Sequence, residues 1–301
     1  MAGYAWMAVA VLIWASWLVL TSSGRTTALS IVDLAGFRAL IPTFILAPLL
    51  WRQRRNIAQL GVTRCLLLSA YGAPFTLCVG YGLTYAPVAH AGAMVPGLMP
   101  VFAAALSYVF LGQRLSPRQV ISVLLIQSGA LAILLRTSAA SGAGEMWVGH
   151  LLFLMGALCW ACFTTTVIAL DISPYLATSI VGGVSSVGLI PIWALLDLST
   201  LGSAHPADIL FQAVFQGIFS GLVSLFAFGQ ALRLIGTNAT ALSALTPGVA
   251  TVLAIPVLGQ VPDLIDFSAL TLVVAGLVTG SSNKGGGLGR LPADPKKSQS
   301  A

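Results

Sequence analysis

The chain is poor in charge, and acidic residues are especially scarce. Among 301 residues there are 14 Lys or Arg, 8 Asp or Glu and 3 His, so that charged residues make up 7% and apolar residues 57%. The few charges stand in short clusters between long apolar runs, and the connecting segments are too short to fold alone. This pattern excludes a separate water-soluble catalytic or nucleic-acid-binding domain.

Carboxylates are missing from the interiors of the apolar runs. The acidic residues lie near run ends, in connections or in the tail: Asp33, Glu145, Asp171, Asp197, Asp208, Asp263, Asp266 and Asp294. Proton-driven pumps commonly use an intramembrane carboxylate as the proton carrier. The sequence therefore argues against a carboxylate-based proton antiporter. It leaves export down a gradient, or coupling through His90.

Motifs for cofactors and catalysis are also lacking. Of the four cysteines, Cys159 and Cys162 have metal-ligand spacing, but no second Cys or His pair accompanies them. There is no glycine-rich phosphate loop and no Ser/His/Asp set. We therefore predict no cofactor, no metal site and no catalytic residue, and we expect a protein that is not an enzyme.

What the sequence does contain is about ten apolar runs of membrane-spanning length. A helix that crosses a bilayer needs about 20 apolar residues. The expected spans are 4–22, 31–50, 62–83, 88–111, 118–135, 147–168, 174–195, 208–231, 237–258 and 264–281. The first run has no basic segment before it and is interpreted as a retained span rather than a cleaved signal. Residues 283–301 are rich in Gly, Pro, Lys and Ser and are predicted to form a disordered cytoplasmic tail.

The basic residues alternate between the two sides of these spans. The termini and even-numbered connections hold Arg52, Arg54, Arg55, Arg64, Arg114, Arg118, Arg233, Lys284, Arg290, Lys296 and Lys297. The odd-numbered connections hold only Arg25 and Arg136. Cytoplasmic loops are enriched in Lys and Arg, so both termini are predicted in the cytoplasm of a bacterial cell, with the chain in its inner membrane. The net charge of +6 is then a topology signal, and no nucleic-acid partner is expected.

The second half of the chain repeats the first. A constant offset of 147 residues relates Tyr81-Gly82 to Phe228-Gly229, Pro100 to Pro247, Leu111-Gly112-Gln113 to Leu258-Gly259-Gln260, and Gly129 to Gly276. Trp14-Ala15 and Trp160-Ala161 match at an offset of 146. The expected units are residues 1–138 and 139–282, each with five spans.

An odd number of spans in each repeat inverts the second half relative to the first. The predicted fold class is therefore an all-α membrane protein with ten transmembrane helices arranged as two inverted five-helix repeats. Inverted repeats are typical of secondary transporters, whose substrate site lies near the bilayer midplane between the repeats. Exchange of the two halves between conformations would give alternating access.

These features together resemble the EamA-type drug/metabolite transporter superfamily. The resemblance rests on the two five-helix halves, Trp-Ala near the start of each, a Pro in the fourth span and Leu-Gly-Gln after it. It implies a ten-helix exporter similar to bacterial amino-acid and metabolite exporters. Two departures from the family pattern stand out. The family usually has Glu where this chain has Gln113 and Gln260. Pro96 and Pro100 also lack the aromatic neighbours of aromatic amino-acid exporters.

Arg38 is the first candidate for substrate contact. It lies about seven residues into the second span, among apolar neighbours. A guanidinium at this depth usually faces a cavity or a partner, and its fork can bind a carboxylate through two hydrogen bonds. The alternatives are that Arg38 extends to the interface or pairs with Asp33.

Three prolines are candidate hinges: Pro96, Pro100 and Pro247. A proline inside a helix leaves the carbonyl four residues earlier without its donor, and at membrane depth such carbonyls are tolerated beside a cavity. For Pro247 that carbonyl belongs to Ser243. The alternative is a static kink that serves packing.

The remaining substrate-contact candidates are polar or bulky side chains in the expected spans. An imidazole or phenol can hydrogen-bond a substrate, and a Met-rich apolar wall adapts to varied shapes. The alternatives are helix capping, interface anchoring and ordinary core packing, the last of these especially for the repeat-related Trp160. The candidates are Trp17, Tyr81, Tyr85, His90, Met94, Met99, Trp160, Phe163, Gln230 and Ser243.

The sequence thus predicts a secondary transporter that exports small amphiphilic metabolites, most of all neutral and aromatic amino acids. Its partners are a small-molecule substrate and the lipid bilayer. The sequence leaves the oligomeric state open and is compatible with a monomer. An exporter of drugs or other metabolites, a passive channel and a non-transporting scaffold are the alternatives.

Overall fold

The structure is a computed structural model that describes residues 1–23, 28–112, 116–139, 144–170, 172–195, 198–235, 239, 242–243 and 245–281. The described residues form helices and short connections, without a strand. The helices are α1 (Ala2–Ser23), α2 (Ile31–Leu60), α3 (Val62–Ser69), α4 (Ala73–Tyr85), α5 (Val88–Leu111), α6 (Pro117–Ala139), α7 (Met146–Leu170), α8 (Pro174–Leu195), α9 (Pro206–Gln212), the π-helix η2 (Ala213–Val223), α10 (Ser224–Ile235), α12 (Thr246–Leu258) and α13 (Leu264–Ser281).

Each of the ten expected spans contains one or more of these helices. The third span is shared by α3 and α4, and the eighth by α9, η2 and α10. Within the described residues, seven helical segments are long and apolar enough to cross a membrane, and α12 and α13 are shorter apolar helices. The predicted all-α membrane fold is confirmed.

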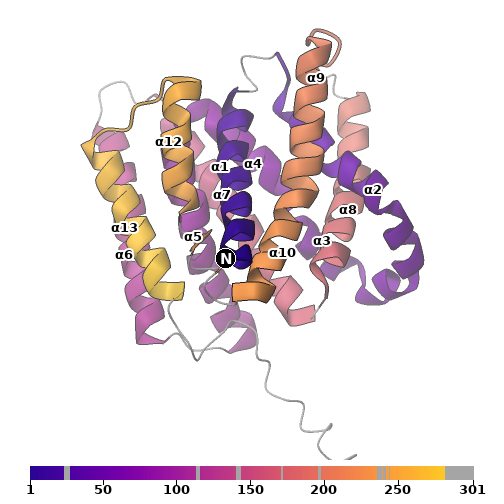
Figure 1. The fold of residues 1–301 in the computed structure, drawn as a ribbon, viewed down its shortest axis with the longest axis horizontal. Helices are drawn as coiled ribbons and strands as arrows, with labels where there is room; N and C mark the ends of the chain where they lie inside the picture. The colour runs from indigo at the N-terminus through magenta and orange to yellow at the C-terminus, as the bar shows by residue number, and fades with distance from the viewer. Residues whose placement is uncertain are drawn as a thin grey trace, which may run out of the picture.

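The helix packing pairs equivalent helices of the two halves, and Figure 1 shows α6 beside α13 at the left and α2 beside α8 at the right. Helix α2 packs against α8, α5 against α12, and α6 against α13, so that equivalent helices of the two halves pair with one another. The other contacts also occur in equivalent sets, since α1 packs against α10 and α12 just as α7 packs against α4 and α5. This reciprocity is what two inverted five-helix repeats produce.

The contact between α6 and α13 shows the symmetry at the level of single residues. A Cβ added to Gly129 would lie 2.6 Å from the carbonyl oxygen of Ala269, and one added to Gly276 would lie 2.9 Å from that of Ser122. Ser122 and Ala269 are themselves related by the offset of 147. The hydroxyl of Ser122 also donates to the carbonyl of Gly276 at 2.7 Å. Small residues that allow backbones to approach closely are typical of membrane helix interfaces.

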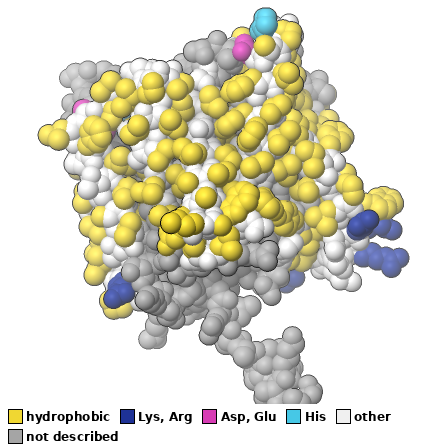
Figure 2. All heavy atoms as spheres, viewed as in Figure 1, with side chains coloured by type: hydrophobic (Ala, Val, Ile, Leu, Met, Phe, Trp, Pro, Cys, Tyr) yellow, Lys and Arg dark blue, Asp and Glu magenta, His cyan; other side chains and the backbone are white. Residues whose placement is uncertain are grey.

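The outer surface is apolar over most of its height (Figure 2). Large side chains such as Phe44, Phe110 and Val187 are about three-quarters exposed, at 74%, 75% and 74%. Lys and Arg side chains gather at the lower end in Figure 2, whereas acidic and His side chains are seen at the upper end. Such a surface is stable only where lipid surrounds it, and the chain is a multi-pass membrane protein.

The structure corrects the expected geometry of one candidate hinge. Pro96 and Pro100 lie within the continuous helix α5. Pro247, however, occupies one of the first two positions of α12 instead of a helix interior. At the start of a helix a backbone N–H has no intrahelical partner, so proline is well tolerated there. The carbonyl of Ser243 is therefore not freed by a mid-helix proline.

The neutral Gln of the second Leu-Gly-Gln caps a helix. The side-chain oxygen of Gln260 accepts a hydrogen bond from the backbone N–H of Val88, the first residue of α5, at 2.9 Å. A capping acceptor is what the start of a helix needs, and a neutral amide supplies it without a charge. The equivalent Gln113 lies outside the described residues.

Candidate functional site

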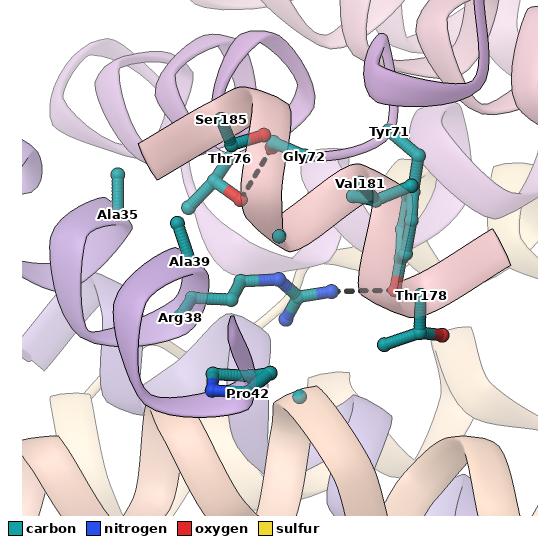
Figure 3. A pocket seen from close by; sticks show the side chains of 12 residues that line it. Ala35, Arg38, Ala39, Pro42, Tyr71, Gly72, Thr76, Thr178, Val181 and Ser185 are labelled. Atoms are coloured by element: carbon teal, nitrogen blue, oxygen red, sulfur yellow. Dashed lines mark hydrogen bonds between the residues drawn. The ribbon is translucent and has the colours of Figure 1, made fainter. Parts of the chain in front are cut away.

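A hollow lies beside Arg38 between α2, the α3–α4 junction, α8 and η2 (Figure 3). Its empty volume is about 380 Å³, including the part that opens outward. Small and hydroxyl-bearing residues make up most of its lining, which consists of Ala35, Arg38, Ala39, Pro42, Tyr71, Gly72, Thr76, Thr178, Val181, Gly182, Ser185 and Gly221. The hollow therefore presents one cation among small polar and apolar groups.

Arg38 extends from α2 into this hollow toward Tyr71 (Figure 3). Its guanidinium donates to the hydroxyl of Tyr71 and to the hydroxyl of Ser220. It also lies 4.8 Å from the centre of the Trp17 ring and 5.3 Å from that of Tyr71. Aromatic faces attract a cation, and a guanidinium stacks well on them. Arg38 is thus partly buried and held among side chains of neighbouring helices, and it does not extend to the interface.

The alternative of a pair between Arg38 and Asp33 is not formed. Among the described residues, Arg38 has no carboxylate within ion-pair distance. Asp33 is fully buried and accepts hydrogen bonds from polar groups near the start of α2 and the end of α8: Ser30, Trp193, Ser199 and Thr200. The positive charge of Arg38 therefore lacks a counter-charge among the described side chains.

Irregular helix geometry in both halves coincides with the hollow. In the first half, α3 ends at Ser69 and α4 begins at Ala73, and Tyr71 and Gly72 lie in the break. The offset of 147 carries residues 70–72 onto 217–219, inside the π-helix η2. Broken helices line the binding sites of many transporters, and the first half has such a break here. π-Helical turns likewise concentrate at functional sites.

The break between α3 and α4 has a local cause. Gly72 packs so closely against α8 that an added Cβ would meet the hydroxyl of Ser185. Pro74 stands at one of the first two positions of α4 and starts the new helix. The freed N–H of Ala73 donates to the Ser185 hydroxyl at 3.0 Å. A partner on α8 thus satisfies backbone that would otherwise be unpaired at membrane depth.

Aromatic rings from α1, α4, α7 and the α3–α4 junction form a wall beside the guanidinium. Trp17 stacks on Phe75 with ring centres 5.5 Å apart. Tyr71 meets Trp160 edge-on at 4.6 Å and stacks on Phe163 at 4.8 Å. Aromatic contacts of this kind add rigidity to a buried surface. The cluster brings together three predicted residues, Trp17, Trp160 and Phe163, next to Arg38.

A buried amide fixes the Trp17 ring. Its Nε1–H donates to the side-chain oxygen of Gln216 at 2.9 Å. The amide nitrogen of Gln216 donates in turn to Thr21 at 3.3 Å and to Gln212 at 3.2 Å. Gln212 and Gln216 are at most 1% exposed. Their polar groups are paired with each other and with α1, so η2 and α1 are tied together beside the hollow.

Replacing Gln216 by Leu is expected to lower the free energy of unfolding by about 1–3 kcal/mol, because the buried N–H of Trp17 loses its acceptor. Thermal unfolding followed by tryptophan fluorescence in lipid nanodiscs measures the change. Gln127→Leu is the control, since Gln127 is exposed on α6. Equal stability of the two variants would remove this role from Gln216.

The other candidates lie outside the lining of the hollow. Met94 is 3% exposed and belongs to a cluster of buried apolar side chains that includes Val95 and Phe153, and Met99 packs against the same cluster. Tyr81 and Tyr85 are 40% and 39% exposed. Gln230 is half-buried on α10, and Ser243 is half-buried before α12. His90 is buried in a separate cluster with His150 and Asp266.

Sequence reasoning missed Tyr71, Gln216 and Ser220. A signal for Gln216 was present, because Gln212, Gln216 and Ser220 follow one another at intervals of four residues in an apolar run. Residues four apart lie on one helix face, so this run carries a polar stripe that must face protein or a cavity. Nothing comparable marks Tyr71, whose place depends on the break between α3 and α4.

Comparisons with known proteins agree with this architecture. The model of the EamA-like transporter family matches residues 1–135 and again residues 147–281. The chain is 24% identical over 229 residues to the uncharacterized transporter YyaM of Bacillus subtilis (strain 168), which covers 73% of this chain and 71% of that protein. A solved crystal structure, described only as that of a protein, superposes with a TM-score of 0.57 at 17% identity, over 93% of this chain and 95% of the other. That likeness concerns the fold. With the family model matched in both halves, the chain belongs to the EamA-like transporter family.

Proposed function

We propose that this transporter is a secondary carrier for small amphiphilic carboxylates, above all neutral and aromatic amino acids. The observation that carries the proposal is the guanidinium of Arg38, which lies in a hollow at two irregular helices without a described counter-charge. A partly buried cation inside a membrane protein favours an anionic group as its partner. The substrate carboxylate is that partner.

The surroundings of Arg38 suit an amphiphilic molecule. A guanidinium has five N–H donors, and the hydroxyls of Tyr71 and Ser220 take up only part of them. A carboxylate can accept from the others or replace a hydroxyl. The rings of Trp17, Tyr71 and Trp160 supply an apolar surface for the substrate body. A single cation favours a substrate with one carboxylate over a multiply charged phosphate ester.

The orientation in the membrane follows from the basic side chains. Arg52, Arg54, Arg55 and Arg64 lie near the junction of α2 and α3, and Arg118 lies in the first turn of α6. Enrichment of Arg on the cytoplasmic side supports cytoplasmic termini and a bacterial inner membrane. Arg38 precedes Arg52 by 14 residues, which is about 21 Å along an α-helix. The site is then nearer to the outer surface, and the halves at residues 1–138 and 139–282 rock around it to export substrate.

Counterflow in proteoliposomes tests the proposal. Vesicles with the purified full chain are loaded with unlabelled amino acids and receive trace labelled tryptophan, methionine or threonine outside, without a pH gradient. A carrier accumulates label transiently, because the inward and outward movements of substrate alternate at one site. Equilibration without an overshoot would indicate a channel. The absence of uptake of any of the three, in vesicles with correctly folded protein, would contradict amino-acid transport.

A further inference from the structure

Three titratable side chains from three helices form a buried hydrogen-bonded chain away from the Arg38 hollow. Nδ1 of His90, on α5, lies 3.0 Å from Nε2 of His150, on α7. Nε2 of His90 lies 3.2 Å from Oδ1 of Asp266, on α13. The side chains of His90 and Asp266 are 3% and 11% exposed, and His150 is 2% exposed.

One ring nitrogen in this chain has no partner. Nδ1 of His150 is buried and makes no hydrogen bond with a described residue. If both imidazoles are neutral, Nε2–H of His90 donates to Asp266, Nε2–H of His150 donates to His90, and Nδ1 of His150 is an unpaired acceptor. If His90 carries a second proton, Nδ1 of His150 becomes an unpaired donor. Buried polar groups without a partner are rare in proteins and often mark functional positions.

The number of protons decides the net charge of the group. With two neutral imidazoles and an ionised Asp266, the three side chains carry one negative charge. One added proton makes the group neutral and turns the contact between His90 and Asp266 into an ion pair. A proton bound here therefore replaces a net negative charge by an ion pair between α5 and α13.

The neighbouring elements add little charge. His150 is the group that faces His90 from α7, and Asp266 is the one that faces it from α13. The described parts of α1, α4, α6 and α12 place no titratable group in bonding contact with either imidazole. Asp263 contacts Asp266 through a reciprocal cap, in which the backbone N–H of each residue donates to the carboxylate of the other at 3.1 and 2.9 Å. This cap fixes the Asp266 carboxylate at the start of α13.

The three residues join the two halves of the transporter at one end. His90, His150 and Asp266 all lie within the first turn or two of their helices. These helix starts lie at the end of the bundle away from Arg52, Arg54 and Arg55, which belong to the last part of α2. Helix α5 belongs to the first half, whereas α7 and α13 belong to the second. In a carrier that alternates access, the halves must separate at this end when the site opens there.

We propose that His90, His150 and Asp266 bind one proton from the water at this end and act as a latch that holds it closed. The proton is added to the histidine pair while Asp266 stays ionised, and no bond between heavy atoms forms or breaks. The ion pair between α5 and α13 strengthens closure, and loss of the proton weakens it. Opening admits water to Nδ1 of His150. The latch rests on the proposed carrier function, and its tests use no transported substrate.

Nuclear magnetic resonance of ring-¹⁵N histidine tests proton binding directly. The chain has only three histidines, and His205 is exposed at the start of α9, where it serves as an internal reference. We expect the signals of His90 and His150 to titrate together, as a coupled pair. In Asp266→Asn the shared titration moves about one pH unit or more toward acid, because the charge that favours the imidazolium is gone. Independent titration of the two rings, or no effect of Asp266→Asn, would overturn the proposal.

Hydrogen exchange tests closure. In nanodiscs, residues 84–92 and 263–270 of the wild type should exchange several-fold more slowly at acidic than at alkaline pH, after correction for intrinsic rates. Asp266→Asn should lose this difference. Asp208→Asn should retain it, since Asp208 is a carboxylate in the first turn of α9 at the same end. A pH difference that persists in Asp266→Asn, or is missing from the wild type, would contradict the latch. Either result leaves the counterflow test of the carrier unaffected.

Discussion

Replacement of Arg38 by Gln is expected to lower kcat/KM for a carboxylate substrate by about 100-fold or more. Two hydrogen bonds between a guanidinium and a carboxylate are worth about 3 kcal/mol together, which corresponds to that factor. The loss should be large because the described residues supply no second cation near the hollow. Arg38→Lys keeps the charge but not the planar fork, so its kcat/KM should lie between those of the wild type and Arg38→Gln. Initial rates of labelled substrate uptake into proteoliposomes measure the effect.

Arg54→Gln is the matched control for this experiment. Arg54 also lies over a tryptophan ring, with its guanidinium 4.5 Å from the centre of Trp51, and it donates to the carbonyl of Trp51 at 2.8 Å. Trp51 is 70% exposed, however, and lies far from the hollow. Transport by Arg54→Gln should equal that of the wild type. If Arg38→Gln also transported like the wild type, Arg38 would not bind the substrate.

Adding a methyl group at either Gly129 or Gly276 is expected to lower the free energy of unfolding by about 1–3 kcal/mol. In Gly129→Ala the new Cβ would lie 2.6 Å from the carbonyl of Ala269, and in Gly276→Ala it would lie 2.7 Å from a side-chain carbon of Ile126. Helices α6 and α13 would have to move apart. Because the two contacts are related by the repeat, the two losses should be similar. Thermal unfolding in nanodiscs measures both.

Gly188→Ala controls for the gain in helix propensity. Gly188 lies on α8 with nothing within 4 Å of the added Cβ, so the substitution should leave stability unchanged or raise it by up to about 1 kcal/mol. In the double variant Gly129→Ala with Gly276→Ala, the free energy of unfolding should fall by less than the sum of the two single decreases, because both substitutions alter one interface. Equal stability of all three single variants would show that close approach at these glycines is unimportant.

The sequence was sufficient to predict the membrane spans and the relation between the halves. Apolar runs of about 20 residues can be recognised without tertiary structure, since the thickness of the bilayer sets their length. The constant offset between Gly129 and Gly276 likewise predicted equivalent positions, and these two glycines face one another's helices in the structure. Arg38 could be singled out because an isolated cation in an apolar run is unusual.

The neighbours of Arg38 could not be predicted in the same way. Ser220 is 182 residues away from Arg38, and Gln216 is 199 residues away from its partner Trp17. Helical periodicity tells which residues share a face, but it does not say which other helix that face meets. The break at Tyr71 also depends on Ser185 of α8, which satisfies the freed backbone N–H. The expected mid-helix position of Pro247 was wrong for the same reason, because a helix boundary depends on its surroundings.

The sequence by itself thus determined a ten-helix membrane protein of two inverted repeats with a single cation, Arg38, inside a span. The length of apolar runs, the asymmetry of charge and internal repetition are local or periodic properties, so they can be recognised in the sequence without knowledge of tertiary contacts. The tertiary structure decided that Arg38 lies between Trp17 and Tyr71, and that His90 joins His150 to Asp266. Those contacts arise where helices from the two halves cross, and only packing in three dimensions fixes such crossings.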